Sequence, residues 1–206
     1  MPAPIIQLNV ECGLSPAESS KIRDIVRDGK ILIFPTDTIY GLGCDAFHES
    51  AIRRIHEIKG RAPAHPFSVH VASISELEKY VAPLSKRERI LMERLLPGPY
   101  TVVLKASAIA PPACVSSEGK IGLRVPNSRS FQLVYEASGR PVVGTSVNRT
   151  GQPPLAQVEE IIREFSEHVH LIIATVEPMT QKSSSVIDIT FDPPRVLRGR
   201  MPEGLP

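Results

Sequence analysis

Two cations flank a single glycine in the stretch EIKGRAPAHP, residues 57–66. Lys59 falls where a helix would end, and Gly60 is a residue type that often follows a helix, so the cation could simply complement the helix dipole. The alternative is an anion-binding clamp, because an arginine fork and a lysine point charge both suit phosphate. Taken alone, the stretch favours the helix cap, with Arg61 as a solvated surface charge.

A second group of polar residues follows the apolar run KILIFP. The segment TDTIYGLG offers two hydroxyls, a carboxylate and a phenol, and Thr36, Thr38 and Tyr40 could grip a small polar ligand. Strand ends and the loops after them are where open α/β sheets usually place their sites. The alternative is a turn in which Thr36 and Asp37 bond their own backbone. The local sequence does not separate the two.

Further candidate residues lie in or after apolar runs that read as strands. Ser146 and Asn148, in GTSVNRTG, could hydrogen-bond phosphate or ribose, and the alternative is a polar turn closed by Gly151. His70 in PFSVHV would lie opposite the core-facing valines, yet a lone strand histidine is more often structural. Arg124 and Arg198 end two further strands and together would add positive charge to one edge of a sheet.

Common catalytic signatures are absent from the sequence. It has no GxxxxGK[ST] phosphate loop, no HExxH and no GxSxG, and GLGCDA is an incomplete dinucleotide fingerprint. His168 and His170 share one strand face, but no further ligands accompany them. We therefore expect neither a protein nucleophile nor a metal held by protein side chains.

The elements that would position these residues alternate between helix and strand. Ser15 with Glu18 and Ser85 with Glu88 predict two capping boxes, and Gly29 is a natural stop for the helix that begins after Ser15. The other expected helices cover roughly residues 48–59, 75–80, 85–96, 128–137 and 155–165. The expected strands are KILIFP, FSVHVA, YTVVLKA, KIGLRVP, PVVGTS, VHLIIA, SSVIDI and PRVLRG. The segment TDTIYGLGCDAF is expected to be a loop. This alternation predicts an α/β sheet, and neighbouring strands without a helix between them make it mixed rather than purely parallel.

Composition places the chain among ordinary globular proteins. It has 206 residues, 42% hydrophobic and 22% charged, and its net charge of +2 is too small to indicate nucleic acid or membrane binding by itself. The three cysteines are far apart without a CxxC pair, and no segment is typical of a signal peptide or membrane span. We expect one domain over residues 1–206, with a core of about 14–198, in the cytoplasm and without a membrane partner.

Six fragments in a fixed order make the chain recognisable. FPTDTIYGLGCDA, IKGRAPAHPFSVHV, PGPYTVVL, IGLRVPNS, GTSVNRTGQPP and SSSVID together resemble the YrdC-like family, the L-threonylcarbamoyladenylate synthases. The resemblance implies a twisted, open mixed sheet with flanking helices around a concave basic cavity. It implies condensation of L-threonine, bicarbonate and ATP, accompanied by Mg²⁺, into L-threonylcarbamoyl-AMP and pyrophosphate. That product would feed the tRNA threonylcarbamoyl transfer machinery, which forms N6-threonylcarbamoyladenosine at position 37 of ANN-decoding tRNAs.

The resemblance also implies residue roles. Lys59 and Arg61 would hold the ATP phosphates as the catalytic pair. Arg124, Ser146, Asn148 and Arg198 would complete the ATP site, and Thr36, Thr38, Tyr40, His70 and Ser184 would bind threonine.

Two segments depart from the usual family pattern. Met179–Ser183 replaces a glycine-rich run, and Leu197-Arg198-Gly199-Arg200 stands where Leu-Arg-Pro-Gly is usual. These departures leave open a divergent carbamoyl-adenylate enzyme with another acceptor or carbamoyl donor. A third possibility is a non-catalytic protein of the same fold that binds tRNA or double-stranded RNA, which would show steep salt dependence.

Overall fold

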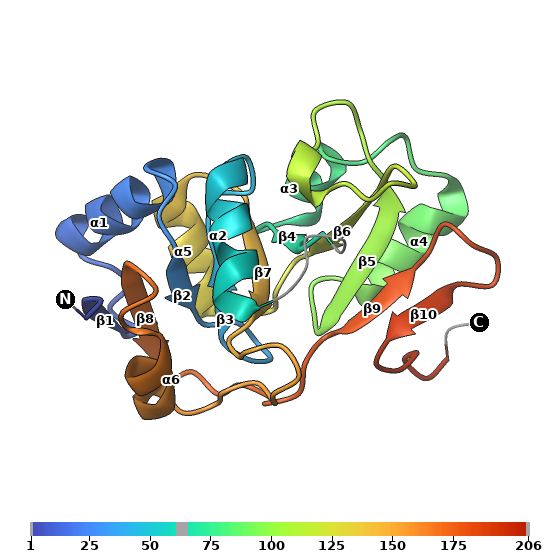
Figure 1. The fold of residues 1–206 in the computed structure, drawn as a ribbon. Coiled ribbons are helices and arrows are strands. Elements are labelled where there is room, and N and C mark those ends of the chain that lie inside the picture. Colours follow the sequence, from blue (N-terminus) through green and yellow to red (C-terminus); the bar gives the residue numbers. More distant parts are fainter. Residues whose placement is uncertain (1, 61–65, 205–206) are drawn as a thin grey trace.

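A single open mixed sheet of ten strands forms the centre of the molecule, in the order β1-β8-β2-β3-β7-β4-β6-β5-β9-β10 (Figure 1). The computed structural model describes residues 2–60 and 66–204. The strands are β1 (Ile5–Leu8), β2 (Leu32–Phe34), β3 (Gly41–Gly43), β4 (Ser68–His70), β5 (Tyr100–Lys105), β6 (Lys120–Arg124), β7 (Val142–Ser146), β8 (Leu171–Thr175), β9 (Ser185–Asp188) and β10 (Arg195–Arg198). Parallel pairs such as β4 with β6 occur beside antiparallel pairs such as β5 with β6, which confirms the predicted mixed sheet.

The helices begin and end close to the predicted positions. They are α1 (Pro16–Arg27), α2 (Glu49–Lys59), α3 (Ile74–Glu78), α4 (Lys86–Leu95), α5 (Arg129–Ser138) and α6 (Val158–Phe165), with a short 3₁₀ turn at Pro112–Cys114. Both predicted capping boxes form, Ser15 with Glu18 and Ser85 with Glu88. The helix α6 begins at Val158 rather than near Leu155, since the residues before it stay extended. No helix in this described part of the chain combines the length and apolar character that a membrane span needs.

Both faces of the sheet are covered at β2 and β8, and this explains the continuous apolar runs of these two strands. In β2, Leu32 and Phe34 pack with α1 and α5 on one face, whereas Ile33 belongs to the larger core on the other. In β8, Leu171 and Ile173 pack on the same face as α1 and α5, whereas Ile172 belongs to the larger core. A strand buried on both sides needs apolar residues at successive positions.

The structure corrects the prediction at β3 and adds β1. The glycine-rich segment expected as loop contains the strand Gly41–Gly43, antiparallel to both β2 and β7. Glycine is required there because a Cβ on Gly43 would lie 1.9 Å from the Val143 carbonyl oxygen. The strand β1 pairs with β8 and lies before the predicted start of the core. Both strands were missed because they are short, and glycine is rare in strand interiors.

A long connection, here called the strap (residues 176–184), leads from β8 across the sheet to β9 and is orange to red in Figure 1. The backbone N–H of Thr180 donates to the carbonyl of Asp37 at 3.1 Å, and that of Gln181 to the carbonyl of Thr38 at 2.8 Å. The strap therefore rests on the segment that follows β2, and it delivers Ser183 and Ser184 to the same region.

Candidate active site

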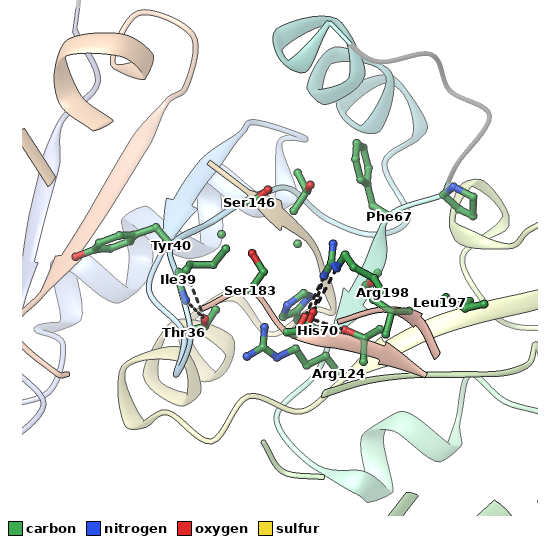
Figure 2. A pocket seen from close by; sticks show the side chains of 18 residues that line it. Thr36, Ile39, Tyr40, Phe67, His70, Arg124, Ser146, Ser183, Leu197 and Arg198 are labelled. Atoms are coloured by element: carbon green, nitrogen blue, oxygen red, sulfur yellow. Dashed lines mark hydrogen bonds between the residues drawn. The ribbon is translucent and has the colours of Figure 1, made fainter. Parts of the chain in front are cut away.

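A cavity of about 330 Å³ opens where strands from both halves of the sheet end (Figure 2). Its wall combines hydroxyls, two arginines, one histidine and a few apolar side chains. The lining residues that the sequence predicts for the site are Thr36, Tyr40, His70, Arg124, Ser146, Ser184 and Arg198. Seven residues from distant parts of the chain thus meet at one cavity, which is large enough for a small polar ligand.

Arg124, at the end of β6, is the most deeply held charge of this cavity, with only 4% of its surface exposed. Its Nη2 donates to Asp37 Oδ1 at 2.6 Å and to Thr38 Oγ1 at 2.8 Å. Burial lowers the pKa of Arg124, and the carboxylate of Asp37 opposes that shift. The ion pair fixes the guanidinium plane at the cavity wall, because an arginine fork bonded at two atoms cannot rotate freely.

Arg198, in the edge strand β10, joins the cavity through Ser184. Its Nη2 donates to the carbonyl oxygen of Ser184 at 3.0 Å and to the Ser184 hydroxyl at 3.2 Å. The same hydroxyl lies 3.4 Å from Thr101 Oγ1 in β5. This set of bonds couples the end of the strap to two strands, and Arg198 lines the same cavity as Arg124.

His70 lies in the cavity wall between aromatic rings. Its ring centroid is 6.0 Å from that of Phe34 and 5.9 Å from that of Phe131, and its Nδ1 has no hydrogen-bond partner in the described part of the protein. Burial lowers the pKa of His70 to about 3, and the charge of Arg124 acts in the same direction. His70 is consequently neutral at physiological pH and keeps one buried nitrogen for a ligand.

The residues after β2 form the local turn through Thr36 and also lie at the cavity. Thr36 Oγ1 donates to the Ile39 carbonyl at 2.7 Å and accepts from the Thr38 N–H at 3.1 Å, so it closes a local turn while it lines the cavity. Asp37 pairs with Arg124, and Thr38 reaches the site through the same arginine. Tyr40 contributes the side of its ring, because its hydroxyl accepts the Thr175 N–H and points away from the cavity in Figure 2.

Lys59 ends α2 as predicted, with Gly60 in the left-handed conformation at φ 63°. Lys59 is only 4% exposed, and its ammonium donates to the Ser146 carbonyl at 2.6 Å, the Asn148 carbonyl at 3.0 Å and Asn148 Oδ1 at 2.8 Å. Ser146 Oγ also donates to Asn148 Oδ1, at 2.6 Å. Lys59, Ser146 and Asn148 therefore meet in space, with Lys59 behind the cavity wall that Ser146 forms. Arg61, the second cation of EIKGRAPAHP, lies outside the described residues.

Several lining residues were not identified from the sequence. Gly144 is one, since a Cβ there would lie 2.3 Å from the His70 ring. A glycine within a strand is a recognised sign of close approach, and it could have been read in PVVGTS. Thr101, Ser183 and Leu197 also line the cavity, but nothing in their local sequence signals it.

The fold and this cavity define a class of protein: an open α/β protein with a polar small-molecule site whose two arginines suit a phosphate or carboxylate. The sequence model of the Sua5/YciO/YrdC family, described as "Telomere recombination", matches residues 24–199, and the chain belongs to this family. The resemblance inferred from the six fragments is thereby confirmed.

Individual relatives extend the comparison. Threonylcarbamoyl-AMP synthase of Pyrococcus abyssi is 35% identical over 192 residues, which cover 92% of this chain and 56% of that protein. The crystal structure of P. abyssi Sua5 complexed with L-threonine superposes with a TM-score of 0.86 at 31% identity, covering 95% of this chain and 57% of that one. The protein named "Uncharacterized protein YciO" of Escherichia coli is 35% identical over 177 residues, 85% of each chain. This chain thus spans little more than half the length of the Pyrococcus relative.

Proposed function

We propose that the cavity binds L-threonine and ATP and condenses them with bicarbonate into L-threonylcarbamoyl-AMP. The observation that carries this proposal is the pairing of two cavity arginines with hydroxyls and a neutral histidine in one small site. The names of several relatives and the L-threonine bound to P. abyssi Sua5 support the choice of substrates.

The proposed reaction has two bond-forming steps. The amine of threonine attacks the carbon of bicarbonate, water leaves, and a carbamate forms. A carbamate oxygen then attacks the α-phosphorus of ATP, and the bond to the β-phosphate oxygen breaks to release pyrophosphate. Arg124 and Arg198 would stabilise the negative charge that builds on the phosphoryl oxygens, so that no protein nucleophile is needed.

His70 would act as a hydrogen-bonding group rather than as a base. A group with a pKa of about 3 holds a proton poorly, so it cannot retain the one that the threonine ammonium must lose. The two arginines favour the neutral amine in the same cavity, because a further positive charge beside them is unfavourable. We infer that the ammonium proton passes to solvent water before the amine reacts, and that His70 orients the substrate through its unpartnered nitrogen.

Lys59 and Asn148 would serve ATP through Ser146. Because the Lys59 ammonium already donates to three protein oxygens, its main role in this proposal is to hold the Ser146–Asn148 turn in place. Arg61 keeps its proposed role as a phosphate ligand. Thr36, Tyr40 and Ser184 would surround threonine, with Thr38 supporting Arg124.

The proposal assigns no protein ligand to Mg²⁺. The residues that line the cavity include no carboxylate, and the described residues contain no group of three or more histidine, cysteine, aspartate or glutamate side chains suited to a metal. Any Mg²⁺ would have to arrive with ATP, held by phosphate oxygens and water.

Delivery to tRNA completes the proposal. The adenylate would pass to the tRNA threonylcarbamoyl transfer machinery, and ATP and tRNA would meet this chain in the cytoplasm. Because the altered segment Met179–Ser183 delivers Ser183 to the cavity wall, a different amine acceptor is the second candidate.

One assay tests the proposal. The protein is incubated with ATP, ¹⁴C-bicarbonate and either L-threonine or a panel of other amino acids, and pyrophosphate and labelled adenylate are measured. We expect both products only with L-threonine, and a loss of 100-fold or more in Arg198→Ala, as for removal of a charge-stabilising donor. Arg54→Ala, an exposed arginine paired with Glu57, is the control. Product with another amino acid would favour the second candidate, and no product with any amine would refute the proposal that the protein is an adenylate-forming enzyme.

A further inference from the structure

A second cavity, of about 510 Å³, adjoins the first. Ser183 lines both, so the two cavities share one wall. The other residues around the second cavity are Pro99, Tyr100, Thr180, Lys182, Ser185, Gly199 and Arg200. A ligand in this position would lie directly beside the substrates proposed above.

The two segments that depart from the usual family pattern build this cavity together. Thr180, Lys182 and Ser183 belong to the strap, and Gly199 and Arg200 follow β10. They are about 20 positions apart in the sequence, and only the pairing of β9 with β10 brings them to one place. The departures therefore coincide in space, which suggests that they serve one ligand.

A tight turn at Gly199 places Arg200 at the cavity. Gly199 adopts φ 81°, and a Cβ there would lie 2.4 Å from Ser185 Oγ. The backbone N–H of Arg200 donates to that same hydroxyl at 3.0 Å. Glycine at position 199 thus lets the chain approach β9 closely and points the following residue to the cavity.

The cavity carries positive charge without compensation. No carboxylate is among its described lining residues, and neither Lys182 nor Arg200 forms an ion pair within the described part of the chain. The hydroxyls of Thr180 and Ser183 lie beside these cations as further donors. Two cations with several hydroxyls suit an anion that has many oxygens and more than one charge, which describes a phosphate ester or diphosphate better than a carboxylate.

We propose that the second cavity binds a small phosphate-bearing anion of the class of pyrophosphate, the leaving group of the reaction assigned to the first cavity. The inference rests on that proposed function for the identity of the anion, and on Lys182 and Arg200 for the site. Both cations are exposed, so binding is weak, salt-dependent and suited to release rather than to storage.

Amide chemical shifts test the site directly. The ¹⁵N-labelled protein is titrated with inorganic pyrophosphate, and the Gly199 amide reports the second cavity while the Gly144 amide reports the first. We expect the Gly199 signal to shift and to saturate as pyrophosphate is added. The apparent Kd of pyrophosphate should rise at least 10-fold in Lys182→Ala/Arg200→Ala. Lys21→Ala/Arg23→Ala, which removes the same charge from exposed positions on α1, should leave that Kd unchanged.

Two results would overturn the inference. One is a Gly199 signal that does not respond to pyrophosphate, and the other is an equal Kd in the wild type and the double variant. AMP serves as a second probe: a Gly199 shift with AMP but not with pyrophosphate would assign the cavity to a nucleotide instead of the leaving group. If Gly199 titrates with pyrophosphate while no adenylate forms in the assay above, the anion site stands and the proposed reaction fails.

Discussion

Three buried ionisable side chains set the electrostatics of the site. Arg124 is charged and paired with Asp37, His70 is neutral, and the Lys59 ammonium is surrounded by oxygens of the Ser146–Asn148 turn. Each is held by contacts that exist before any ligand arrives. The site therefore presents fixed charges to an anionic ligand and needs little reorganisation when it binds.

Replacing Lys59 should affect stability as well as activity. We expect Lys59→Ala to lower the free energy of unfolding by about 2–3 kcal/mol, because three partly buried oxygens lose a charged donor. Urea denaturation measures this change. Lys79→Ala, which breaks an exposed pair with Glu76, is the control and should cost less than about 1 kcal/mol. Equal costs for the two variants would show that the contacts of Lys59 add no stability.

The buried neutral His70 should make the protein sensitive to acid. The folded-state pKa of His70 lies below the ordinary value of 6.5. The stability that depends on a neutral His70 is therefore fully present above pH 6.5 and is lost as the pH falls toward about 3. Between pH 6.5 and 5 the loss from His70 alone should be about 2 kcal/mol. Urea denaturation at several pH values, with wild type and His70→Gln, measures it. If the free energy of unfolding of His70→Gln fell with pH as steeply as that of the wild type, His70 would not be the neutral buried group inferred above.

At the scale of elements, the strap links the two halves of the cavity. Its first part is attached to α5 by Glu177, whose carboxylate accepts from the backbone N–H of Arg129 at 3.0 Å and of Ser130 at 2.8 Å. Burial raises the pKa of Glu177, but these hydrogen bonds outweigh it and the pKa is lowered overall. A carboxylate at a helix N-terminus satisfies free N–H groups and complements the dipole.

Releasing this attachment should loosen the strap. We expect Glu177→Ala to cost about 1 kcal/mol of stability, the usual value for a lost helix cap, and to raise the KM for threonine several-fold because the strap carries Ser184. Thermal unfolding and steady-state kinetics measure the two effects. Glu167→Ala, an exposed position after α6, is the matched control. An unchanged KM would mean that the strap keeps its position without Glu177.

At the scale of the whole molecule, one continuous sheet joins the halves that carry the site. The pairing of β4 with β7 connects the strands around β2 to those around β5, and the cavity lies along this connection. A ligand that contacts both halves therefore stabilises the entire fold.

Substrate binding should be visible in global unfolding. We expect one cooperative thermal transition, and L-threonine at 100 times its Kd should add about 2.7 kcal/mol to the free energy of unfolding. Differential scanning calorimetry measures both. Arg198→Ala should lose most of this stabilisation by L-threonine, since Arg198 positions Ser184. Stabilisation by double-stranded RNA at low salt, without any by threonine, would instead favour the RNA-binding interpretation.

Much of this architecture follows from local sequence. The capping boxes at Ser15 and Ser85, the stop at Gly60 and the apolar runs of β2 and β8 each depend on neighbours within a few residues, so they could be predicted. The order of the six fragments identified the family, which in turn indicated seven residues that line the cavity. The strand β3 was missed because it is short and two of its three residues are glycine, which is rare in strand interiors.

Only the tertiary structure decided how those residues act. That Lys59 bonds the Ser146–Asn148 turn, that Asp37 pairs with Arg124, and that His70 is neutral all depend on contacts across many tens of residues. The sequence lists such groups without their distances, and hydrogen bonds and pKa values depend on distance and burial. For the same reason, the stretch EIKGRAPAHP specified the end of a helix by itself, while the partners of its lysine were set by the fold around it.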